Sequence, residues 1–151
     1  SIQSAGNFFQ NVNPQVDQIK NIIESEIENY YYKFKNQNDG IIKSWPKNFN
    51  LNGWLVSMKN GGKIKPHIHD YGWLSGSIYI NVPPKATKDS GNLVVTSHDL
   101  KDGKRNTKET KNINVVTGSL CLFPSSLLHY TIPFESEDDR IVLAFDVIPN
   151  K

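Results

Sequence analysis

The stretch from Leu74 to Pro84 reads LSGSIYINVPP, and apolar residues occupy every second position of it, interrupted once by Gly76. As far as Asn81, polar side chains or a tyrosine stand at the positions between them. A period of two residues predicts a β-strand, because successive side chains of a strand point to opposite faces of a sheet. The Pro83-Pro84 pair ends the pattern and indicates a turn.

Six further runs of strand-like sequence flank this stretch, separated by clusters of glycine, proline, asparagine and aspartate. The runs are Leu51–Lys59, Asn92–Ser97, Ile113–Val116, Ser119–Phe123, His129–Pro133 and Ile141–Ile148. No helical pattern lies between them, so the strands do not show the alternation of a parallel α/β sheet. Many short strands with turns at this spacing predict a sandwich or a barrel.

The first third of the chain has the period of an amphipathic helix over residues 14–36, with apolar side chains at steps of three and four. Asn13 is a suitable N-cap, and Pro14 suits the first turn. The turn-forming run Asn38-Asp39-Gly40 follows the helix. We therefore expect a mainly β fold, a double-sheet jelly roll with an N-terminal helix packed against it, formed by residues 1–151 as a single domain.

The composition argues against several classes of function. A formal charge of +2 and a pI near 8.6 are too mild to indicate nucleic-acid binding. The most cationic segment, residues 101–112, also carries Asp102 and Glu109, and its polar, aperiodic sequence predicts a mobile surface loop. No apolar stretch is long enough to span a bilayer. We expect no nucleic-acid or membrane partner and a cytoplasmic protein.

The single cysteine, Cys121, excludes a disulfide within the chain and fits a reducing compartment. It lies in an apolar run, Ser119–Phe123, so we expect a buried and unreactive thiol.

Three of the four histidines have the spacing of metal ligands. His67 and His69 are two residues apart on an expected strand, so both imidazoles would point to the same face. His129 follows 60 residues later, and in an antiparallel sandwich a distant strand can return beside the first. Three convergent nitrogen ligands with open positions opposite them suit a redox metal. The alternative for each histidine is a hydrogen bond to the backbone or to solvent, which is the interpretation that we keep for His98.

The residues around these histidines extend the pattern in three blocks. The blocks are Pro66–Tyr79, Gly118–Ser125 followed by Leu128-His129, and Asp139–Asp146. In order and spacing they resemble the family of 2-oxoglutarate/Fe(II)-dependent oxygenases, whose members share an H-x-H…L-S-G-x-Y-Y core. The resemblance covers roughly residues 50 to 150. It implies a double-stranded β-helix that binds Fe(II), 2-oxoglutarate and O2, hydroxylates a small-molecule or peptidyl substrate, and releases succinate and CO2.

The same resemblance implies that His67 and His129 are metal ligands, and it leaves the third ligand open. The wider superfamily has an Asp or Glu two residues after the first histidine, where this chain has His69. The parity of a strand favours His69, whereas the charge balance of Fe(II) favours Asp70. Water alone in the third position is a further alternative.

For the cosubstrate, the resemblance implies that Arg140 pairs with the distal carboxylate of 2-oxoglutarate and that Tyr79 assists. A guanidinium forms a bidentate pair with a carboxylate, which is a strong way to fix that end. Ser75 and Ser77 share the strand face of Tyr79, and we expect them to line the same pocket. The alternative for Arg140 is an exposed side chain that pairs with the acidic run 135–139.

Two other functions are compatible with a jelly roll. Cupins also carry His-x-His, but they usually have a Glu three or four residues later, where this chain has Trp73 or Leu74. A binding module without a metal belongs to a different class, because fold alone does not settle function. Such a module would purify without iron and would not respond to 2-oxoglutarate.

Overall fold

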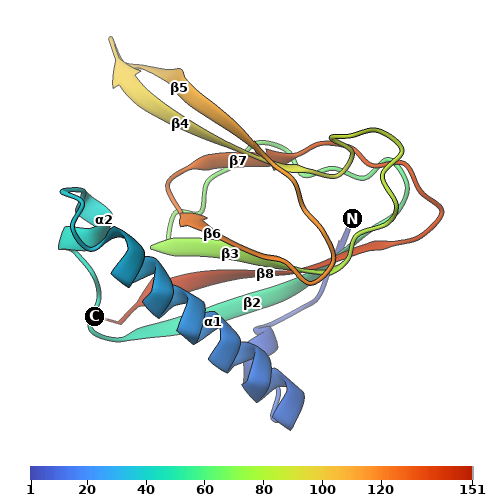
Figure 1. Ribbon diagram of the computed structural model, residues 1–151, viewed down its shortest axis with the longest axis horizontal. Coiled ribbons are helices and arrows are strands. Elements are labelled where there is room, and N and C mark those ends of the chain that lie inside the picture. Colours follow the sequence, from blue (N-terminus) through green and yellow to red (C-terminus); the bar gives the residue numbers. More distant parts are fainter. Residues whose placement is uncertain (151) are drawn as a thin grey trace.

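The computed structural model describes residues 1–150, without the side chains of residues 98–101, 105 and 108 (Figure 1). The elements are β1 (Ile2–Gln3), a short 3-10 helix η1 (Phe8–Gln10), α1 (Pro14–Phe34), α2 (Gly40–Lys43), β2 (Phe49–Met58), β3 (Leu74–Asn81), β4 (Leu93–Lys101), β5 (Lys104–Ile113), β6 (Leu120–Pro124), β7 (Leu128–Thr131) and β8 (Arg140–Pro149).

The strands form two antiparallel sheets that face each other (Figure 1). The larger sheet has the order β1-β2-β8-β3-β6, and the smaller one has the order β5-β4-β7. Strands close in space are distant in sequence, since β2 pairs with β8, and β8 pairs with β3. This is the double-stranded β-helix, or jelly roll, that the alternating sequence predicts, and the predicted fold class is confirmed.

Helix α1 covers the outer face of the larger sheet (Figure 1). It begins as predicted, because the Asn13 side chain accepts a hydrogen bond from the Val16 amide at 2.9 Å and Pro14 occupies the first turn. Its buried side chains Ile23 and Ile27 pack against the sheet in one cluster with Phe145. Neither α1 nor any other helix in the described part of the chain is long and apolar enough to cross a membrane.

Strand β8 separates the helix-covered core from the space between the sheets. Phe145 and Val147 lie fully buried under α1. The alternate side chains point the other way and line a cavity between the sheets; these are Arg140, Val142, Ala144 and Asp146. The register with β3 places Ser75 directly opposite Asp146. The cavity therefore takes its lining from strand residues of opposite parity to those that pack against the helix.

Two expectations about local structure outside the histidine cluster are wrong. The polar segment 101–112 is no loop, because β4 and β5 pair as a hairpin whose turn at Asp102-Gly103 has positive φ angles of 53° and 71°. Backbone hydrogen bonds to β4 stabilise a strand there, although the polar composition of the segment favours a loop. The expected strand Ile113–Val116 ends at Ile113. Val115 is nevertheless buried in the core between the sheets, since an apolar run can be buried without regular pairing.

Candidate metal centre

Three histidines meet in the cavity between the sheets. His67 and His69 lie in the connection between β2 and β3, and His129 lies on β7. The expectation of a strand at residues 67–69 is wrong, since His67 makes only an isolated bridge to His129. The two residues exchange backbone hydrogen bonds of 3.0 Å in both directions. This bridge, rather than a shared strand face, places two residues side by side that are 62 positions apart in the sequence (129 − 67).

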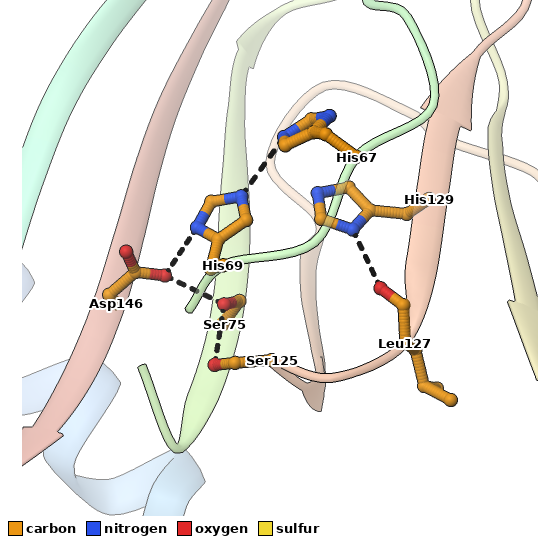
Figure 2. A network of polar contacts seen from close by, with 7 residues as sticks. All are labelled: His67, His69, Ser75, Ser125, Leu127, His129 and Asp146. Carbon is orange, nitrogen blue, oxygen red and sulfur yellow. Dashed lines mark hydrogen bonds and ion pairs between the residues drawn. The ribbon is translucent and has the colours of Figure 1, made fainter. Parts of the chain in front are cut away.

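The three imidazole rings point toward one another (Figure 2). Their ring centroids are 4.2 to 5.0 Å apart, and one ligand nitrogen of each lies within 4.8 Å of the others. The Nε2 atoms of His67 and His69 are 3.0 Å apart. Two nitrogens bound at right angles to one ion by bonds of about 2.1 Å would be about 3 Å apart. The spacing of this pair therefore fits adjacent ligands of one metal ion.

Each of the three rings is held from behind by an oxygen that accepts from its Nδ1. The acceptors are the Lys65 carbonyl for His67 at 2.8 Å, the Leu127 carbonyl for His129 at 3.1 Å, and the Asp146 carboxylate for His69 at 2.7 Å. Because a carbonyl or carboxylate can only accept, each Nδ1 carries a proton. In the neutral imidazoles the lone pair is then on Nε2, which is the state that metal-binding histidines require.

The electrostatics of His129 favour this neutral state. Only 6% of the residue is exposed. Burial is the main cause that lowers the pKa of His129 to about 4, and the neighbouring His67 and His69 lower it further. The hydrogen bond to Leu127 and the charge of Asp146 act in the opposite direction. At neutral pH the ring is therefore uncharged and can donate its lone pair to a cation.

The two candidates for the third ligand lie in different places. The group of convergent ligand atoms found among the described residues contains His69 and not Asp70. Asp70 is exposed and borders the cavity. The carboxylate nearest the rings belongs to Asp146, which sequence reasoning did not single out. The sequence did contain a signal for it: Asp146 and Arg140 are an even number of positions apart in the last strand-like run, so a strand would place both side chains on the same face.

Arg140 reaches the same cavity from the other end of β8. It is only 2% exposed, so the alternative of a surface arginine is wrong. Its acidic neighbour Asp139 pairs instead with Lys59 at 2.7 Å. Arg140 donates through Nη2 to the Gly91 carbonyl at 3.1 Å, and its buried Nε has no partner in the described part of the chain. A buried cation that lines a cavity and has no ion pair among the described residues fits a site for an anion.

Tyr79 lies beside Arg140, whose Cζ atom is 5.5 Å from the centroid of the tyrosine ring. Burial is the main cause that raises the pKa of Tyr79 to about 12, although the arginine opposes it. The hydroxyl therefore keeps its proton at neutral pH and can donate a hydrogen bond. Ser75 and Ser77 line the cavity on the same strand. The Ser75 hydroxyl is already engaged, since it donates to Asp146 at 2.7 Å.

The cavity that joins these groups has a volume of about 370 Å³. This is within the usual range for sites that bind small molecules. The histidines and Arg140 both contribute to its lining, together with apolar side chains from both sheets such as Val56, Leu93 and Phe123. The arrangement can hold a divalent metal next to the three rings and an anion next to the guanidinium.

Comparisons with known proteins agree with this geometry. Residues 52–146 match the family described as "Putative 2OG-Fe(II) oxygenase". No match was found among curated proteins. Similar solved structures include a prolyl-4-hydroxylase from Pseudomonas putida, which is 19% identical with a TM-score of 0.52 over 73% of this chain and 56% of the other. At such identities the likeness shows the fold alone.

Two further structures were crystallised with 2-oxoglutarate. The viral collagen prolyl hydroxylase of Paramecium Bursaria Chlorella virus-1 is 13% identical, with a TM-score of 0.59 over 99% of this chain and 79% of its own. HygX from Streptomyces hygroscopicus, with nickel, 2-oxoglutarate and hygromycin B bound, is 14% identical, with a TM-score of 0.52 over 68% of this chain and 57% of its own. The chain spans only about half the length of three bacterial structures that it matches, those from Pseudomonas putida, Burkholderia pseudomallei and Streptomyces hygroscopicus.

Proposed function

Because the chain belongs to the 2OG-Fe(II) oxygenase family, we propose that it is an Fe(II)- and 2-oxoglutarate-dependent dioxygenase that hydroxylates a small-molecule or peptidyl substrate. The observation that carries the proposal is the convergence of three histidines whose Nδ1 atoms are all engaged by acceptors. The family match favours an oxygenase over a cupin. The tests below distinguish the oxygenase from a binding module without a metal.

In this proposal His67, His69 and His129 hold the iron through their Nε2 atoms. Three protein ligands would not fill the coordination of the ion, so the cosubstrate and O2 could also bind to it. Bound iron would supply, with 2-oxoglutarate and O2, the chemistry of C–H hydroxylation, with succinate and CO2 as co-products.

The remaining residues of the cavity bind and orient 2-oxoglutarate or support the histidines. Arg140 pairs with the distal carboxylate of 2-oxoglutarate through its guanidinium group, which lines the cavity. Tyr79 donates a hydrogen bond to the same carboxylate from its protonated hydroxyl. Ser77 lines this part of the cavity, and Ser75 supports the histidine side through Asp146. The apolar lining keeps bulk water away from the ion pair, which strengthens it.

We also propose that residues 1–151 act as one domain. The packing of α1 on the larger sheet supports this, since Ile23 and Ile27 share a core cluster with Leu51 and Phe145 from the strands. The helix and the sheets therefore do not have separate cores.

A titration with Mn(II), used as a redox-stable substitute for Fe(II), tests the metal site. The parent protein should bind one equivalent, and His67→Ala or His129→Ala should abolish binding. His98→Ala changes the remaining histidine of the chain and should bind like the parent. If both cluster variants bind as well as the parent, the metal site lies elsewhere.

A turnover assay tests the activity. The protein is incubated with Fe(II), O2 and 2-oxoglutarate, and succinate is measured in the presence of candidate substrates. Prolyl peptides and hygromycin B are suitable first candidates, because the proteins of similar structure include prolyl hydroxylases and a hygromycin B complex. If 2-oxoglutarate neither binds to the metal-loaded protein nor yields succinate, the cosubstrate assignment fails and a cupin-type metal-binding protein or a binding module takes its place.

A further inference from the structure

One of the three histidine rings is held differently from the other two. The Nδ1 atoms of His67 and His129 donate to neutral backbone carbonyls. The Nδ1 atom of His69 donates to a carboxylate, that of Asp146, at 2.7 Å. A hydrogen bond to a charged acceptor is roughly twice as strong as one between neutral groups. Of the three rings, His69 therefore has the partner with the greatest effect on its orientation and basicity.

The carboxylate of Asp146 is itself fixed by a chain of hydroxyl groups (Figure 2). Its Oδ1 accepts from the Ser75 hydroxyl at 2.7 Å as well as from His69. The Ser75 oxygen is 2.7 Å from the Ser125 oxygen, and both serines are only 1% exposed. Because Ser75 donates its proton to Asp146, Ser125 must donate to Ser75. The order of donation runs from Ser125 through Ser75 to Asp146.

The surrounding backbone holds this network in place. Ser75 and Asp146 are directly opposite each other in neighbouring strands. The His69 amide donates to the Ser125 carbonyl at 3.1 Å, so the histidine is tied to the network at its backbone as well. A Cβ atom at Gly72 would lie 2.5 Å from the Ser125 hydroxyl and 3.2 Å from Asp146 Oδ1. The network is thus closely packed and mostly shielded, with 14% of the His69 and 13% of the Asp146 side chain exposed.

Among the described residues, the Asp146 carboxylate pairs with no lysine or arginine, and the hydrogen-bond donors that it contacts are His69 and Ser75. Two histidines and a carboxylate would present one negative charge to Fe(II), whereas three neutral histidines present none. A carboxylate hydrogen-bonded behind a histidine ligand increases the basicity of that ligand. Asp146 therefore provides the negative charge that a carboxylate ligand would provide, but it does so through the His69 ring and not by direct contact with the ion.

We propose that Asp146 is the positioning residue of the metal centre, which holds His69 with Nε2 toward the ion and supplies from behind the ring the negative charge that the histidine ligands lack. This inference rests on the proposed function, because it takes His69 as the third ligand. Ser75 and Ser125 act through Asp146 by fixing the direction of its carboxylate.

The first test is Asp146→Asn, with the affinity for Mn(II) alone measured by titration. Asparagine has nearly the same shape and can still accept from His69, so the change mainly removes charge. We expect the dissociation constant for Mn(II) to rise about 10- to 100-fold, the range found when such partners of metal-binding histidines are removed. Asp138→Asn removes an exposed carboxylate close in sequence and should bind Mn(II) like the parent. If Asp146→Asn also binds like the parent, the inference is wrong.

The second test repeats Asp146→Asn in a His69→Asp background. Aspartate at position 69 brings its own carboxylate to the ion, and a second carboxylate nearby would then only repel it. In this background Asp146→Asn should bind Mn(II) at least as tightly as His69→Asp alone. An equal loss of affinity in both backgrounds would show that Asp146 has a structural role independent of His69 and would overturn the inference.

The third test observes the ring directly. In the Zn(II)-loaded protein, the nitrogen resonances of His69 should report a protonated Nδ1 in the parent and a shifted Nδ1 resonance in Asp146→Asn, while those of His67 and His129 stay unchanged. Unchanged His69 resonances would contradict the inference. If the parent binds neither Mn(II) nor Zn(II), the proposed function itself fails. If the parent binds metal and only the Asp146 effects are missing, the proposed function survives and the positioning role fails.

Discussion

At the scale of single residues, the proposed function makes the buried guanidinium of Arg140 the main determinant of how strongly the cavity binds 2-oxoglutarate. Removing one partner of a buried charge-assisted pair costs on the order of 2–5 kcal/mol. Arg140→Ala should therefore raise the dissociation constant of 2-oxoglutarate by about 30-fold or more, by the rule of tenfold per 1.4 kcal/mol. Calorimetric titration of 2-oxoglutarate into the Mn(II)-loaded protein measures this.

Tyr79→Phe is the matched smaller change in the same part of the cavity. It removes one hydrogen bond of about 1 kcal/mol and should weaken 2-oxoglutarate binding by about fivefold. Both variants should bind Mn(II) as the parent does. If Arg140→Ala binds 2-oxoglutarate normally while the parent is active, another cation holds the carboxylate.

Cys121 is only partly buried, not fully buried as expected, but its thiol should still be poorly reactive in the folded protein. Burial raises the pKa of Cys121 from its ordinary value of 9 to about 11, although Lys111 opposes the shift. At pH 8 the thiolate fraction should then be about 100-fold smaller than in the unfolded chain, since each pKa unit is a factor of ten. Ellman's reagent with and without urea compares the two rates, and equal rates would contradict the assignment.

At the scale of secondary-structure elements, the Phe145 side chain packs directly against the backbone of β3 at Gly76. A Cβ atom at Gly76 would lie 2.3 Å from the ring of the fully buried Phe145 and 2.7 Å from the Cys121 carbonyl oxygen. The carbonyl belongs to the paired strand β6 and cannot move without breaking the ladder. Gly76→Ala should lower the free energy of unfolding by about 1–3 kcal/mol, the usual cost of overpacking.

Urea unfolding followed by circular dichroism measures this loss. Gly40→Ala is the control, because a Cβ atom at Gly40 would meet no other atom within 4 Å. The control should stay within about 0.5 kcal/mol of the parent, as expected for a surface change. Equal stability of the two variants would mean that β3 and Phe145 do not pack as described.

At the scale of the whole molecule, one metal ion should stabilise both sheets together, because His129 comes from the smaller sheet while Asp146, which holds His69, comes from the larger one. A ligand at 100 times its dissociation constant adds about 2.7 kcal/mol to the free energy of unfolding. For a chain of this length, that corresponds to an increase in Tm of roughly 5–10 °C. Mn(II) should produce this increase in a thermal unfolding experiment.

Calcium is the matched control ion, since it prefers oxygen ligands to imidazole and should leave Tm unchanged. His129→Ala should abolish the increase with Mn(II), whatever its own Tm is. An equal increase with Mn(II) and Ca(II) would indicate nonspecific ion binding rather than the histidine site.

The sequence by itself determined the elements whose signal is local. The period of two in Leu74–Val82 and the capped amphipathic pattern after Asn13 both predict the observed elements, because neighbouring side chains define the face that is buried. The spacing of His67, His69 and His129 also pointed to one cluster, and the structure brings the three rings together. In these cases the information lies within a few residues, or in a pattern that the chemistry of one ion requires.

Only the tertiary structure decided what depends on pairing between distant residues. The polar segment 104–113 became a strand because β4 offered it backbone partners. Arg140 became buried because its side chain turns toward Gly91 rather than toward the acidic residues before it. Asp146 came to lie behind His69 through the register of β8 with β3 and a connection of irregular backbone. Such contacts join residues up to 77 positions apart, and their energy exists only once the chain has folded, so no local pattern could reveal them.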